Sequence, residues 1–151
     1  MAYINVSPAN SNVTLQLSTA TISTTSSGYI VPALQDITIN NGTAVFNWTQ
    51  LDSFAQQAVP TPANNSIAAN LVIDPTTFFT GSNGVAGIFD LSNNATLVYF
   101  RAYLNGRLTG ARYVSGQGYI TGLAPTANPT APVFVSPITI SVDGAITAST
   151  V

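Results

Sequence analysis

Polar and apolar side chains alternate with a period of two in several short segments, and this constrains the fold more than any other feature. The pattern is clear in "NVTLQLS" (residues 12–18), "DITIN" (36–40), "TAVFNW" (43–48) and "PITISVDG" (137–144). Such alternation is typical of half-buried strands, because successive side chains of a strand point to opposite faces. Asn-Gly, Asp-Gly and Ser-Gly pairs punctuate the segments as turns. We therefore expect a mainly β chain folded as an antiparallel β-sandwich or barrel.

One segment, "SNGVAGIFDLSNN", has a helical spacing instead. From Val85 onward its apolar residues recur at i, i+3 and i+4. Ser82 or Asn83 could cap the start of a helix, and Asn94 could end it. We predict one short α-helix over about residues 85–92 that flanks the sheet. A loop with scattered apolar residues is the alternative, because each glycine disfavours a helix by about 1 kcal/mol.

The longest strand candidate is "ATLVYFRAYLN", residues 95–105. One face would carry Val98, Phe100, Ala102 and Leu104, and the other Leu97, Tyr99, Arg101 and Tyr103. The second face is too apolar to lie free in water, so the short helix or another subunit should cover it. A covered arginine needs a carboxylate or a carbonyl as partner. Arg101 is therefore a candidate for an ion pair with an Asp, including one from a neighbouring subunit.

Residues 49–70, "TQLDSFAQQAVPTPANNSIAAN", form the longest stretch without clear alternation. Pro60 and Pro62 disfavour a central strand there. We predict a long loop, and a loop of this length inside a small domain usually has a function or is disordered. The length of 151 residues predicts a single domain over residues 1–151.

Charged residues make up only 5% of the chain, against roughly 25% in typical domains. All cationic side chains, Arg101, Arg107 and Arg112, lie close together in the sequence, and the acidic residues are five Asp. No basic stripe exists that could bind nucleic acid tightly through its phosphates. Arg107 and Arg112 flank a predicted hairpin turn, where they should sit at a rim or a subunit boundary.

The chain contains no His, Cys, Lys or Glu. Triads with His, thiolate nucleophiles, Schiff-base lysines and zinc sites therefore cannot be built. We predict that the chain is not an enzyme and binds no cofactor or metal. The N-terminus does not resemble a signal peptide, and no run reaches the ~18 apolar residues of a membrane span. We therefore expect no membrane partner.

The glycine-rich segment "YVSGQGYITG" could be taken for a phosphate-binding loop. Such a loop leads into the N-terminus of a helix, whereas this segment continues with a β pattern. A strand that is kinked or bulged at its glycines is the better interpretation.

The second half of the chain resembles the tail tube proteins of tailed bacteriophages. The resemblance covers roughly residues 84–147 and has a fixed order: the helix "GIFDLSNN", the strand "TLVYFRAYLNG", the segment "YVSGQGYITGL" and the strand "PITISVDGAIT". The residues that match the pattern of the family's glycine-containing strand are Tyr113, Ser115, Gly116, Gly118, Tyr119, Ile120 and Thr121. The first half carries no matching motif.

The resemblance implies a structural virion protein. In the family, hexameric rings of identical subunits stack into a hollow tube that conducts phage DNA without binding it specifically. A long loop and the N-terminal segment reach the next ring, and residues 49–70 and 1–9 would take these roles here. Partners would be copies of the chain and other tail proteins, and the location would be the virion tail, after assembly in the host cytoplasm. The residues that we assign to the subunit interface are Gln50, Leu51, Phe54, Tyr99, Arg101, Tyr103, Arg107 and Arg112.

The chain departs from the family in one respect, and other functions remain open. Relatives often line the lumen with acidic residues, whereas five Asp per subunit allow only a sparse lining. A head decoration or fibre protein is the main alternative, although a fibre would more often contain repeats. A secreted adhesin or pilin-like β domain is a further alternative, which should carry a signal peptide.

Overall fold

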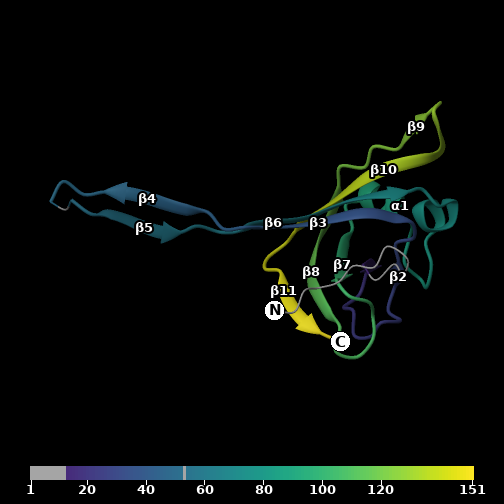
Figure 1. Ribbon diagram of the computed structural model, residues 1–151, viewed down its shortest axis with the longest axis horizontal. Coiled ribbons are helices and arrows are strands. Elements are labelled where there is room, and N and C mark those ends of the chain that lie inside the picture. Colours follow the sequence, from purple (N-terminus) through teal and green to yellow (C-terminus); the bar gives the residue numbers. More distant parts are fainter. Residues whose placement is uncertain (1–12, 53) are drawn as a thin grey trace.

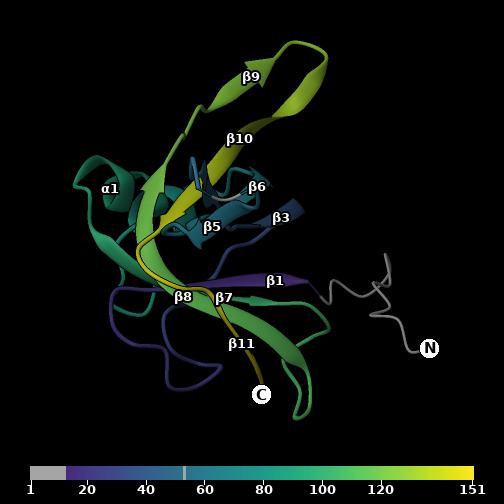
Figure 2. The same cartoon turned by 90° about the vertical axis from the view of Figure 1, so that its left-hand side faces the viewer.

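The computed structural model describes residues 13–52 and 54–151, and most of its strands belong to one antiparallel sheet (Figure 1). Nine strands form this sheet, in the order β2-β1-β7-β8-β10-β6-β3, with β11 beside β8 and β9 beside β10. A further pair, β4 and β5, forms a separate two-stranded sheet. The mainly β fold is confirmed as a sandwich-like curved sheet, and the described strands do not close into a barrel (Figure 2).

The strands of the first half are β1 (Thr14–Ser18), β2 (Tyr29–Ile30), β3 (Leu34–Gly42), β4 (Val45–Thr49), β5 (Gln56–Pro60) and β6 (Asn64–Val72). Those of the second half are β7 (Leu97–Tyr103), β8 (Arg112–Thr121), β9 (Thr126–Asn128), β10 (Ala131–Val142) and β11 (Thr147–Thr150). Every pairing between them is antiparallel. The strands expected from alternation at residues 12–18, 36–40, 95–105 and 137–144 are all present as β1, β3, β7 and β10, although β10 begins six residues earlier than predicted, at Ala131.

The core lies on the concave side of the sheet and is made by alternate residues of its central strands. Leu15 and Leu17 of β1 and Ile138 and Ile140 of β10 are buried there. Val98, Phe100 and Ala102 are also buried, so the predicted inner face of β7 is confirmed. The helices contribute Phe78, Ile88 and Leu91 to the same cluster.

The predicted helix is present as α1 (Ile88–Asn93), and its end at Asn94 is confirmed. The predicted cap is wrong: the N-cap residue is Gly87, without a side-chain bond. Ser82 instead exchanges two backbone hydrogen bonds of 3.0 Å with Val85 in a tight turn. A Cβ atom at Gly87 would lie 2.5 Å from the backbone of Phe79, so this close approach requires glycine. The preceding helical turn, η1 (Thr76–Thr80), was not predicted.

The predicted loop at residues 49–70 is wrong, because β5 and β6 occupy most of it. β3 pairs with β6 as far as Gly42 opposite Asn64, and β4 and β5 continue the projection away from the body (Figure 1). We call β4, β5 and their connection the distal hairpin. All residues of β5 are exposed, so burial imposes no alternation on its sequence. Pro60 is tolerated because it ends a strand of a two-stranded sheet.

The glycine-rich segment forms β8, and the strand interpretation is confirmed. The register of β8 with its neighbours contains no bulge, so the glycines have another role. A Cβ atom at Gly118 would lie 2.2 Å from the carbonyl oxygen of Ser141, and one at Gly116 would lie 2.8 Å from the ring of Phe100. Both positions therefore allow close packing against β10 and the core.

Candidate assembly interface

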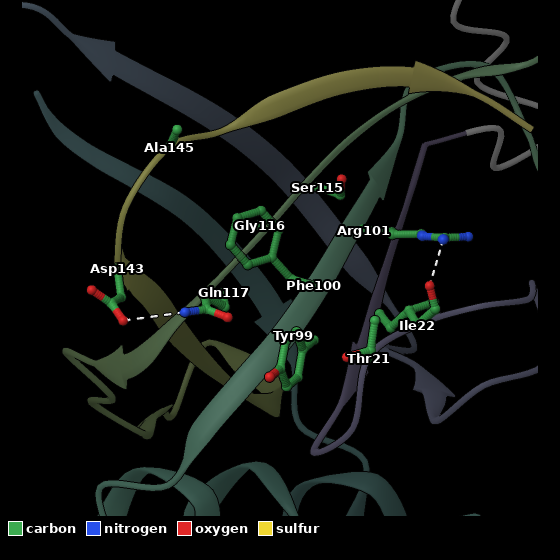
Figure 3. Close-up of a pocket in the computed structure, with 10 residues that line it drawn as sticks. All are labelled: Thr21, Ile22, Tyr99, Phe100, Arg101, Ser115, Gly116, Gln117, Asp143 and Ala145. Atoms are coloured by element: carbon green, nitrogen blue, oxygen red, sulfur yellow. Dashed lines mark hydrogen bonds between the residues drawn. The ribbon is translucent and has the colours of Figure 1, made fainter.

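Five of the eight predicted interface residues lie on or beside the β7–β8 hairpin. On its outer face, cross-strand neighbours are Tyr99 and Gln117, Arg101 and Ser115, and Tyr103 and Tyr113. This face points away from the core, and residues of the segment that precedes β2 lie over part of it (Figure 3). The expectation that the helix or another subunit covers this face is therefore wrong for the part near Arg101 and Tyr103, where the cover is a loop of the same chain.

Arg101 is held by its own chain. Its Nη2 donates a hydrogen bond to the carbonyl of Ile22 (Figure 3). Its guanidinium carbon lies 4.6 Å from the ring centroid of Tyr113. The partner is thus a carbonyl, one of the two kinds expected, and within the described chain it is not an Asp. A cation over an aromatic face is attracted by the ring quadrupole. These contacts fix the loop around Ile22 onto the hairpin.

Tyr103 is fully buried and cannot contact a neighbouring subunit in this conformation. Its hydroxyl donates a 2.7 Å hydrogen bond to Oε1 of Gln16. The amide of Gln16 in turn donates to the carbonyls of Thr24, at 3.2 Å, and Ser27. Because buried polar groups need partners, this network binds the loop before β2 to the hairpin.

A hollow of about 470 Å³ opens beside Arg101. Asp143 accepts a 3.3 Å hydrogen bond from Nε2 of Gln117 on the far side of this hollow from Arg101 (Figure 3). The lining residues are Thr21, Ile22, Tyr99, Phe100, Arg101, Ser115, Gly116, Gln117, Asp143 and Ala145. One carboxylate without a nucleophile and base pair supplies no recognisable catalytic chemistry.

Arg107 and Arg112 are exposed, in agreement with a rim position. Arg107 lies in the connection between β7 and β8 and makes a long 3.5 Å contact to the carbonyl of Thr25. Arg112 begins β8 opposite Thr150 of β11. Leu108, between them, is 81% exposed.

The other three predicted residues, Gln50, Leu51 and Phe54, lie at the turn of the distal hairpin. Leu51 and Phe54 are fully exposed, so no described part of the chain covers them. Phe46 stacks on Trp48 at 6.1 Å between ring centroids, yet remains exposed with Val45 and Val59. The half-buried strand predicted at 43–48 is therefore exposed in the single chain, and its apolar side chains are available to a partner.

A second exposed apolar surface was missed by the sequence analysis. It is a cleft of about 470 Å³, which we call the aromatic cleft, lined by Ile73, Pro75, Phe79, Pro125, Val133 and Phe134. These residues come from segments far apart in the sequence, and no spacing pattern links them. The "FF" pair at residues 78–79, in η1, and the "VF" pair at 133–134, in β10, leave Phe79, Val133 and Phe134 exposed, but the sequence alone does not show that these residues are neighbours.

β3 is the outermost strand at one end of the sheet order, so one of its sides is unpaired among the described strands. Its single charged residue, Asp36, is already occupied: it accepts hydrogen bonds of 2.8 and 3.1 Å from the side-chain and backbone nitrogens of Asn70. Soluble monomers usually protect such an edge with charges, prolines or a covering element. This edge lacks Lys, Glu and Pro along its nine residues.

Burial raises the pKa of Tyr29 well above its ordinary value, and its hydroxyl lies 3.3 Å from the carbonyl oxygen of Ala86. In the described part of the chain, no group of acidic or other metal-ligating side chains could hold an ion. None of the described helices has the length and apolar character needed to cross a bilayer.

No family model matches this chain, and no curated protein matches it by sequence. Solved structures do match. A chain in the virion of a native gene transfer agent particle has 12% identity and a TM-score of 0.57, over 80% of this chain and 88% of that chain. A chain in the tail of an empty gene transfer agent particle, refined with C6 helical symmetry, has 12% identity and a TM-score of 0.62, over 89% and 95%.

A third match is the anti-feeding prophage cap that terminates the tube, with 14% identity and a TM-score of 0.60. It covers 93% of this chain and 89% of that chain. All these neighbours belong to virion, tail or tube-cap assemblies, so the phage tail resemblance is confirmed at the level of the fold. The chain has the fold of proteins that build phage-like tails and their tube caps.

Proposed function

We propose that this chain is a structural subunit of a phage-type tail tube, located in the virion tail and assembled in the host cytoplasm. Copies of the chain would form hexameric rings that stack into a hollow conduit for DNA. The observation that carries the proposal is the shared fold, which covers 89% of this chain and 95% of a chain from a tail with C6 symmetry.

The unpaired edge of β3 supports the formation of rings. A free edge accepts a strand from a second copy through main-chain hydrogen bonds. Because Asp36 is the single charged residue of β3, such pairing meets little charge repulsion. If each copy offers a different edge to each neighbour, the contact is heterologous and closes into a ring at a suitable rotation.

The distal hairpin supports contact between rings, the role that we expected for residues 49–70. It extends away from the body (Figure 1) and ends in Leu51 and Phe54, which are uncovered in the single chain. Residues 1–9, to which the resemblance gives a similar role, lie outside the described residues. Their role remains part of the proposal.

A passive conduit also agrees with the charge of the chain. DNA phosphates bind proteins through Lys and Arg, and the net charge here is −2. DNA would therefore pass without specific binding. Copies of this chain and other tail proteins are the proposed partners, and no enzymatic activity is proposed.

Negative-stain microscopy of the purified protein at rising concentration tests this function. We expect hexameric rings or hollow tubes. Lysines at Thr38 and Asn40, on the β3 edge, should abolish the rings, whereas a lysine at the exposed Asn94, at the end of α1, should not. A particle that stays monomeric or trimeric at every concentration would contradict the proposal and favour a decoration or fibre protein.

A further inference from the structure

The tip of the distal hairpin carries two large apolar side chains that nothing in the described chain covers. Leu51 and Phe54 are both 111% exposed, more than any other large apolar residue described. We call them the tip pair. β3 and β6 connect their hairpin to the body, and the hairpin projects away from it (Figure 1). Exposed apolar groups of this size usually mark a contact site.

The aromatic cleft is apolar, like the tip pair. Its lining combines Phe79 of η1, the nearby Ile73 and Pro75, Val133 and Phe134 of β10, and Pro125. The backbone nitrogen of Ile73 donates a 2.9 Å hydrogen bond to the carbonyl of Phe134, so two of these segments are held together. Phe79 also packs edge-on against the buried ring of Phe78, with centroids 5.0 Å apart. The lining contains no charged residue, so an apolar guest would desolvate no charge there.

The tip pair and the aromatic cleft cannot meet within one molecule. The distal hairpin lies at one end of the long axis, whereas β9, the neighbouring part of β10 and α1 lie toward the other end (Figure 1). A second copy, however, brings the tip pair of one molecule to the cleft of another. A projection and a pocket on opposite ends of one chain make a head-to-tail contact that repeats along an axis.

We propose that Leu51 and Phe54 of one copy insert into the aromatic cleft of a second copy, in the adjacent ring of the tube. This inference rests on the proposed function and names the partner surface of the distal hairpin. Each copy supplies both halves of the contact, so the two are always present in equal number. The apolar surface of both halves leaves water on contact, which is the main driving force for such association.

Engineered cysteines provide a direct test, because the natural chain contains no Cys. Leu51→Cys combined with Val133→Cys places one thiol at the tip and one in the cleft, and leaves Phe54 and Phe134 intact. After mild oxidation of the assembled protein, we expect a ladder of covalent oligomers on a non-reducing gel. The control combines Leu51→Cys with Leu108→Cys, which is 81% exposed but lies outside the cleft, and should give no ladder.

The outcomes separate this inference from the proposed function. Tubes without a ladder, or equal ladders in both variants, would overturn the contact and leave the tail-tube function standing. The cleft would then be open to a different tail protein. Failure of the unmodified chain to form rings or tubes would instead contradict the function itself, and the inference with it.

A mixing experiment tests the two halves independently. Phe54→Asp should block the tip and Phe134→Asp the cleft, so each variant alone should form rings that do not stack. In a mixture, the intact tips of one variant can enter the intact clefts of the other, and paired rings should appear. Both residues are exposed, so unchanged unfolding midpoints would show that folding is intact. Normal tubes from either variant alone would refute the contact.

Discussion

Arg101, which the sequence analysis assigned to the subunit interface, has a hydrogen-bond partner within its own chain. It bonds the Ile22 carbonyl and covers the ring of Tyr113, and so holds the loop that precedes β2 against the hairpin. The positive charge is not needed for repulsion or steering. The planar guanidinium group of Arg101 contacts a backbone oxygen and an aromatic face at the same time, which the ammonium group of a lysine does less well.

Replacing Arg101 with Met should therefore weaken the chain itself. Hydrogen bonds from charged donors contribute about 1.5–3 kcal/mol, and partial exposure of Arg101 places the expected loss of unfolding free energy near the lower value. Urea denaturation measures it, and Arg112→Met, at an exposed position, is the control that should change little. We also expect Arg101→Met to impair ring formation. If this variant forms normal tubes, Arg101 has a packing role within the chain and no role in assembly.

Tyr29 predicts a pH dependence of stability at the alkaline end. Burial raises its pKa in the folded chain, so the unfolded chain loses the phenolic proton first as the pH rises. The stabilisation is therefore complete below about pH 10, the ordinary value for tyrosine, and declines above it. Tyr29→Phe should flatten this decline in unfolding free energy, whereas Tyr119→Phe, at an exposed position, should not. Identical slopes in the two variants would rule out the burial of Tyr29 as the cause.

At the scale of elements, alternation predicted strands that pack on the core, β1, β3, β7 and β10, and also β4, which is exposed in the distal hairpin. The apolar core residues of β1, β7 and β10 are spaced two apart, as Leu15 and Leu17 are, so these sequences record their environment. β5 and residues 64–70 of β6 were predicted to be a loop. β5 buries no residue, whereas β6 buries alternate residues, but polar Asn65 and small Ala69 at the buried positions hid that pattern. Pro60 and Pro62 strengthened that error, since sequence alone does not separate an edge strand from a loop.

The residues of the candidate interface could likewise be predicted only in part. Leu51 and Phe54 stood out as apolar residues in a polar stretch, and their exposure agrees with an interface role. The aromatic cleft was not predictable, because residues 73–79 and 125–134 become neighbours only when the strand pairs form. The burial of Tyr103 depends in the same way on a loop whose sequence, residues 19–28, carries no periodicity.

Removal of the distal hairpin should separate folding from assembly. Replacing residues 43–63 with Asn-Gly joins β3 to β6 by a two-residue turn, the pair most favoured in such hairpins, where Gly42 already faces Asn64. None of the described residues in the deleted segment belongs to the core, so the unfolding free energy should change by less than about 1 kcal/mol. Tubes should be absent by microscopy. Tubes of normal length from this variant would exclude the hairpin from ring stacking.

At the scale of the whole molecule, the scarcity of charge predicts an assembly that is insensitive to simple salt. The Debye length falls from about 30 Å at 0.01 M to about 3 Å at 1 M, which would strongly affect contacts between charged surfaces. With a net charge of −2, the threshold concentration for tubes should change by little over this range of sodium chloride. Sedimentation of the tubes measures this threshold concentration. Sulfate should lower the threshold, because it strengthens apolar burial, and steep dissolution in chloride would show that the few charges dominate.

The connection between β7 and β8 contains an exposed arginine, Arg107, at which trypsin can cut the chain. Trypsin cuts after lysine and arginine, so the only candidate sites are Arg101, Arg107 and Arg112. Arg101 and Arg112 are paired within strands, whereas Arg107 lies in an exposed turn, the kind of place where native proteins are nicked. Digestion of the free subunit should thus begin with a single cut, into residues 1–107 and 108–151. The rate of that cut, before and after assembly, would reveal whether neighbouring subunits cover this corner.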